Sequence, residues 1–228
     1  MTRARIAKVT VLAAAAATLL AGCGLHPGSA AVVGDDVIST QRVDQVAQAL
    51  CSSQAGTAQS QGRELASRGA RQGALQVLLD SDLSRQFGAS KGVQPNQGQV
   101  SAALASNANE INSLPADQRD AFREALKEYV EGRLMLLEVG RQYLTGHGQP
   151  TADQNKAMAA GEKLRADFAK KLDIEVDPRY GTFDQAKGSF APSGGSLSVA
   201  ASQSATDGSS PDPSAGWVAS LPATQKCS

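Results

Sequence analysis

A hairpin signal in residues 30–39, AAVVGDDVIS, constrains the fold of this chain more than any other stretch. Two short apolar runs, residues 31–33 and 37–38, flank the sequence Gly34-Asp35-Asp36. Glycine adopts the positive φ that a tight turn requires, and aspartate side chains bond back to their own backbone. The pattern therefore predicts two short strands joined by a tight turn.

An amphipathic helix is predicted directly after this hairpin. Ser39 or Thr40 is the candidate N-cap, because a hydroxyl there covers an orphan backbone N–H. Arg42 stands where an acidic residue would complete a capping box. The apolar residues that follow have helical spacing and predict one buried face, which consists of Val43, Val46, Ala47 and Leu50.

The composition predicts an aliphatic, mainly helical body. Of the 228 residues, 41% are hydrophobic but only 4% are aromatic, and a chain of this length holds one sizeable core or two small ones. The formal net charge is zero, and loss of the first 22 residues would leave 19 basic against 22 acidic side chains, because it removes Arg3, Arg5 and Lys8. This balance gives no reason to expect nucleic acid as a partner.

The N-terminus has the pattern of a bacterial lipoprotein signal peptide. A basic start is followed by the apolar residues 9–20 and by Leu20-Ala21-Gly22-Cys23, the sequence at which signal peptidase cuts before a cysteine that is then lipidated. An ordinary secretory signal and an uncleaved anchor are the alternatives. We expect residues 1–22 to be removed and residues 23–29 to be a tether. Acyl chains on Cys23 would hold the protein on the extracytoplasmic face of the cell membrane.

Four further helices are predicted from apolar periodicity and from helix-start signals such as Pro95 or Asn96 and Pro115. Residues 52–62 lack that periodicity and are expected to be a surface loop. The alternation in Ile174-Glu175-Val176 predicts a strand that ends before Pro178. The four helices are expected at residues 63–87, 95–111, 116–144 and 152–172.

Three stretches resemble the N-terminal domain of SurA and PrsA-type extracytoplasmic foldases. They are the hairpin and helix of residues 30–50, the run LLDSDLSRQFGASKGVQPNQGQVSAAL, and VDPRYGTFD at residues 176–184. The departures are Arg42 for the usual acidic residue, Asp177 for asparagine and Phe183 for tryptophan. The resemblance implies one mainly α domain over residues 30–184, in which the closing strand returns to the hairpin to form a small antiparallel sheet.

Foldases of this family carry a parvulin prolyl-isomerase domain between the long helix, here residues 116–144, and the closing helix and strand, here residues 152–176. In this chain only residues 145–152 separate those two parts, and a domain of even about 50 residues does not fit there. We therefore expect no isomerase activity.

No other catalytic or cofactor site is expected from the sequence. His26 and His147 lack acidic or cysteine neighbours on a shared element, so neither reads as a base or a metal ligand. Cys51 shows no positioned base that would make it a nucleophile. We predict no metal and no cofactor.

The C-terminal residues 185–228 are rich in Ser, Ala, Pro and Gly and are expected to be a disordered tail. Trp217, Val218 and Leu221 would either dock or be exposed. With Cys23 lipidated, Cys51 and Cys227 are left in a compartment that permits disulfides. Pairing of the two and two free thiols are the alternatives, and we favour pairing.

Two classes of function follow. The first is a non-catalytic, chaperone-like module that binds unfolded or exported polypeptides in an aliphatic groove. The second is an adaptor lipoprotein that docks one folded envelope partner, and a prolyl isomerase is a distant third. The residues expected to line the groove are Leu78, Leu79, Phe87, Phe122, Leu126 and Tyr129.

Overall fold

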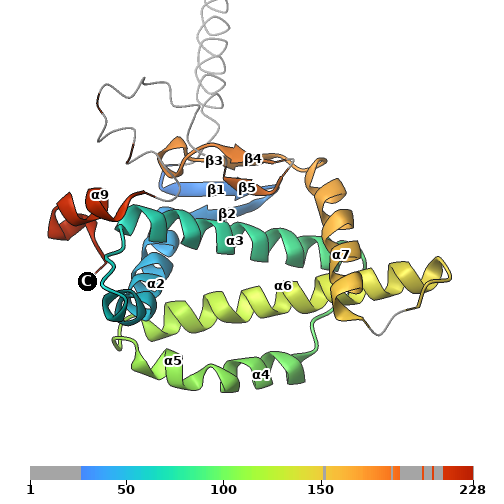
Figure 1. The fold of residues 1–228 in the computed structure, drawn as a ribbon. Coiled ribbons are helices and arrows are strands. Elements are labelled where there is room, and N and C mark those ends of the chain that lie inside the picture. The colour runs from blue at the N-terminus through green and yellow to red at the C-terminus, as the bar shows by residue number, and fades with distance from the viewer. Residues whose placement is uncertain are drawn as a thin grey trace, which may run out of the picture.

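The computed structural model describes residues 27–150, 153–185, 187–190, 202, 207 and 213–227. This part of the chain is mainly helical with a small antiparallel sheet, which confirms the predicted fold class. The sheet lies over α3 (Ser67–Ser90), and α6 (Arg119–Gly146) runs below α3 (Figure 1). Helices α4 (Gln97–Ser106) and α5 (Ala108–Ser113) lie below α6. The predicted signal peptide and Cys23 lie outside the described residues.

The main sheet joins the two ends of the domain. Strands β1 (Ser29–Val33) and β2 (Asp36–Ser39) form the predicted hairpin, and β3 (Ile174–Val176) pairs with the other side of β1. All pairs are antiparallel and the strand order is β2-β1-β3. Gly34 in the turn has φ 61°, as the turn signal requires.

Helix α2 (Thr40–Ser60) begins as predicted but is longer than predicted. Ser39 is the N-cap, and its hydroxyl accepts a hydrogen bond from the Arg42 N–H at 3.1 Å. Residues 52–60, which we expected to form a loop, continue the helix and contain no proline that would end it. Ala58 in this last part is buried, so tertiary packing supports the extension.

Four helices build the body behind the sheet. They are α3 (Ser67–Ser90), α4 (Gln97–Ser106), α6 (Arg119–Gly146) and α7 (Gln154–Ala169), and each lies within a predicted helical stretch or overlaps most of one. The predicted third helix is interrupted at Asn107, whose side-chain amide donates to the Ala103 carbonyl at 2.8 Å. A separate short helix, α5 (Ala108–Ser113), follows this break.

The hydrophobic core has two parts. The larger part lies between the sheet, α2 and α3 and includes Val33, Val43, Leu75 and Leu79. The smaller part lies between α3, α6 and α7, where the rings of Phe87 and Phe168 are 5.4 Å apart. Aliphatic side chains therefore fill most of the interior, as the composition predicted.

The domain continues beyond the predicted boundary at residue 184. Asp177 caps a short 3₁₀ turn (Pro178–Tyr180), and a two-stranded sheet of β4 (Phe183–Asp184) and β5 (Ser189–Phe190) follows. The rings of Phe183 and Phe190 lie 5.5 Å apart across this pair. Residues 187–190 therefore belong to the folded body, because the second phenylalanine gives the first an apolar partner.

The chain end is folded too, which corrects the predicted disordered tail at residues 213–227. This C-terminal segment contains α9 (Ala215–Ser220) and a 3₁₀ turn (Ala223–Gln225), and Val218 is buried. Cys227 N–H donates to the Leu65 carbonyl at 2.8 Å, and Cys227 forms a disulfide with Cys51. Sequence composition did not reveal the segment because these contacts join it to distant residues.

Replacing Cys227 by serine is expected to lower the free energy of unfolding by about 2 kcal/mol. The disulfide spans 176 residues, so its loss frees the unfolded chain considerably. In the folded protein the segment keeps its contacts to Glu64 and Leu65, which limits the freedom that the folded state gains. Urea unfolding would measure the change, and a loss below about 0.5 kcal/mol would show that the bridge restrains only the segment.

Candidate functional site

A cleft of about 700 Å³ opens at the β2 edge of the main sheet. The cleft is lined by strand β2, by the second half of α3 and by residues near the starts of α2 and α6. Pockets of this size accommodate ligands in other proteins. The lining residues are Asp36, Val37, Ile38 and Ser39 of β2, Arg42 of α2, Leu78, Asp82, Arg85, Gln86 and Ala89 of α3, and Glu124 and Glu128 of α6.

The hydrogen bonds of β1 show which of its residues bond toward β3. Asp177 N–H donates to the Ala30 carbonyl, and Gly34 N–H donates to the Asp173 carbonyl, both at 2.9 Å. Residues of an antiparallel ladder alternate between the two neighbouring strands. Val32, midway between Ala30 and Gly34, therefore also bonds toward β3.

The same alternation leaves one backbone position of β2 open. Ala31 and Val33 bond toward β2, where their partners are Ile38 and Asp36. Val37 lies opposite Val32, so its N–H and C=O point away from β1 toward the open edge. Val37 itself is 51% exposed. Within the described residues β2 pairs only with β1, so the cleft contains an unpaired strand edge beside an exposed apolar side chain.

Charged side chains surround this edge in an ordered network. Arg42, which stands where a capping box would have an acidic residue, forms ion pairs with Glu124 and Glu128 of α6. The Gln86 amide donates to the carboxylates of Asp36 and Asp82, at 3.0 and 2.9 Å. The cleft lining contains four carboxylates and two guanidinium groups, so acidic groups prevail.

Asp82 is the most buried carboxylate of the cleft, with 10% of its side chain exposed. Burial raises the pKa of Asp82 above its ordinary value of 3.8, and repulsion from Asp36 adds to this rise. Hydrogen bonding from Gln86 and the charge of Arg85 oppose it. Ionisation of Asp82 in the folded protein therefore costs free energy.

The Asp82→Asn variant should gain stability relative to the native protein as the pH rises. Because the folded-state pKa is raised, the contribution of Asp82 to stability is full below about 3.8 and is lost as the pH rises through the folded value. Asparagine does not titrate and still accepts a hydrogen bond from Gln86. Urea unfolding of both proteins from about pH 4 to pH 7 would test this, and a stability difference that is constant or falls with pH would contradict it.

The structure does not assemble the predicted groove. Leu79 and Phe87 are buried in the two different parts of the core, so no ligand reaches them. Leu78 is also nearly buried but does line the β2 cleft. Phe122 lines a separate hollow beside Leu50 and Ala58, while Leu126 is half-buried and Tyr129 is exposed. The helical stripe that we interpreted as a groove is mainly core.

Sequence reasoning missed most of the residues that line the cleft, and of the predicted groove residues only Leu78 lines it. Arg42, Asp82 and Gln86 are polar residues on helices, and nothing in their spacing distinguishes them from solvent-facing ones. The one available signal was Val37, a valine in a hairpin strand that has no third strand on its side. That signal becomes visible only when the order β2-β1-β3 is known.

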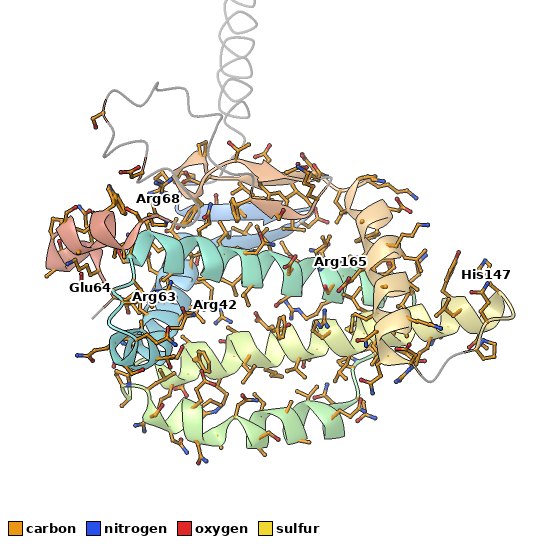
Figure 2. The ribbon with its side chains drawn as sticks, viewed as in Figure 1. Arg42, Arg63, Glu64, Arg68, His147 and Arg165 are labelled. Carbon is orange, nitrogen blue, oxygen red and sulfur yellow. A yellow bond between two sulfur atoms is a disulfide. The ribbon has the colours of Figure 1, made fainter. Side chains whose placement is uncertain are left out.

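His147 does not belong to this site. His147 caps the far end of α6, and Figure 2 shows it distant from Arg42; His26 lies outside the described residues. His147 follows Glu124 by 23 positions, which corresponds to about 35 Å of helix. Within the described ranges, no cluster of three or more His, Cys, Asp or Glu side chains is arranged to hold a metal ion.

Comparisons with protein-family models, with curated proteins and with solved structures gave no match. Among the helices of the described residues, none is both long enough and apolar enough to span a bilayer.

Proposed function

We propose that this protein is a non-catalytic module that binds unfolded or exported polypeptides in the β2 cleft, while a lipid anchor at Cys23 holds it at the extracytoplasmic face of the membrane. The observation that carries the proposal is the open edge of β2 inside a cleft of about 700 Å³. An unpaired strand edge is a template for another extended chain.

The mixed lining suits polypeptides better than a small apolar ligand. Val37 and Ala89 provide exposed apolar surface, while the carboxylates and guanidinium groups give polar contacts around it. An unfolded chain offers both apolar side chains and free backbone groups, and main-chain bonding does not depend on sequence. The resemblance to the foldase family gives separate support for this class of ligand.

Binding of a permanently unfolded chain tests the proposal. Reduced, carbamidomethylated lysozyme is the probe, and native lysozyme is its folded control. We expect the protein to bind the unfolded form at least ten-fold more tightly, measured by fluorescence anisotropy. Equal affinity for the two forms, or no binding of the unfolded chain, would refute the proposal, as would stoichiometric binding to one folded envelope protein alone.

The Cys23→Ala variant tests the lipid anchor. It should leave the membrane fraction or remain unprocessed, because the cysteine supplies the site for the acyl chains. Detergent-phase partitioning and the mass of the N-terminal peptide report the outcome. Unchanged partitioning of the variant, with no acyl mass on the native N-terminal peptide, would contradict the anchor.

A further inference from the structure

We infer that the polypeptide in the β2 cleft binds as an added strand along β2 and that the cleft selects segments in which basic and apolar residues alternate. This inference rests on the proposed function and adds to it the conformation and the chemistry of the bound segment. Three observations support it: the bonding direction of Val37, the two faces of β2, and the excess of carboxylates.

The bonding direction of Val37 fixes where the added strand pairs. Its N–H and C=O point toward the open edge, so one residue of a bound antiparallel strand would exchange two hydrogen bonds with it. A strand added here would lie about 4.8 Å from β2. The cleft lies along all four residues of β2, which gives the added strand room on the side where it must lie.

The two faces of β2 fix which side chains the segment presents. Side chains alternate along a strand, so the residue opposite Val37 points to the same face as this exposed valine. Its two neighbours point to the other face, where Asp36 and Asp82 share the Gln86 amide on α3. The central residue is thus best apolar, and its neighbours meet carboxylates.

The charge around those neighbours favours lysine and arginine. Glu124 and Glu128 from α6 join Asp36 and Asp82 around the cleft, against Arg42 and Arg85. Long basic side chains also lay their aliphatic stems on apolar surface, such as that of the exposed Ala89 in the cleft lining. A segment with acidic residues at these places meets an excess of like charge.

The backbone part of the inference is tested with Val37→Pro and its matched control Val37→Thr. Proline removes the outward N–H, which β1 does not use, so the hairpin keeps its own bonds. Threonine keeps that N–H and the branched shape. The probe is a fluorescein-labelled nonapeptide of alternating lysine and valine, and the readout is anisotropy. We expect at least ten-fold weaker binding to the proline variant and a change within two-fold for threonine.

The charge part is tested with Glu124→Gln and with altered peptides. Glu124 is 61% exposed, and Arg42 keeps Glu128 as a partner in this variant. We expect the lysine–valine peptide to bind the Glu124→Gln protein about three-fold more weakly than the native protein, which is typical of one exposed charge pair. The same peptide with glutamine in place of each lysine should bind both proteins equally. The same peptide with glutamate in place of each lysine should bind the native protein at least ten-fold more weakly than the lysine–valine peptide.

The outcomes separate this inference from the proposed function. Equal binding of the lysine peptide to the native and Val37→Pro proteins would overturn strand addition, and equal or tighter binding of the glutamate peptide would overturn the charge preference. If unfolded lysozyme still binds in either case, the proposed function stands without the inference. Circular dichroism of both Val37 variants verifies that the fold is intact.

Discussion

Replacing Gly161 by alanine is expected to lower the free energy of unfolding by about 3 kcal/mol, the upper part of the range for overpacked cores. A Cβ at this position in α7 would overlap the carbonyl oxygen of Leu136 in α6. Both groups belong to helix backbones, so no side-chain rotation relieves the overlap. The two helices must move apart, and the small core around Phe87 loses its packing.

A glycine in each of the two helices allows α6 and α7 to cross closely. Gly140 of α6 lies against the Ala157 carbonyl of α7, and a Cβ there would overlap that oxygen in turn. Gly140→Ala should therefore destabilise the protein by a similar amount. Because the two substitutions force the same separation, the double variant should lose less than the sum of the single losses.

Gly73→Ala is the matched control for these substitutions. Gly73 lies within α3, is exposed, and a Cβ there meets nothing within 4 Å. Alanine is the better helix former by up to about 1 kcal/mol, so this variant should gain stability. Urea unfolding of all three single variants gives the measurement. A stable Gly161→Ala protein would show that α6 and α7 do not cross as closely as described.

Deleting residues 174–184 is expected to unfold much of the body. The deletion removes β3 and β4, so β1 loses its second partner and β5 its only one. A two-stranded hairpin alone is marginally stable in water. Loss of the cooperative thermal transition in the truncated protein is the expected result, and an unchanged transition would rule out the role of the closing strand.

A point substitution tests the same strand more gently. Glu175 pairs with Val32, the residue of β1 that bonds toward β3. Glu175→Pro removes one donor of this ladder and should cost about 2 kcal/mol, whereas Glu175→Thr keeps the N–H and suits a strand. Equal stability of the two variants would contradict the pairing.

The predictions from the sequence were most accurate for features that depend on local patterns. The turn at Gly34, the cap at Ser39 and the alternation in residues 174–176 each need only neighbouring residues, and each appears in the structure where predicted. The return of the closing strand came from the resemblance, not from any local pattern. Local patterns could not predict the helical conformation of residues 52–60, because burial of Ala58 against the rest of the protein supports it.

The residues of the candidate site are brought together by long-range geometry and were therefore mostly missed. The apolar stripe through Leu79 and Phe87 has the same spacing whether it faces the core or an open groove, and here it faces the core. Conversely, the cleft joins Val37, Asp82 and Glu124 from three distant elements. The folding of the chain end at Val218 likewise arises from distant contacts, which composition does not report.

Photo-crosslinking from Val37 tests the central claim most directly. A benzophenone side chain at this position, in the otherwise native protein, is irradiated with reduced, carbamidomethylated lysozyme, and the products are mapped by mass spectrometry. The control carries the same group at Tyr143, which is 41% exposed near the far end of α6. We predict crosslinks from position 37 in large excess over position 143. Equal yields from the two positions, or none from position 37, would contradict a polypeptide site at the β2 edge.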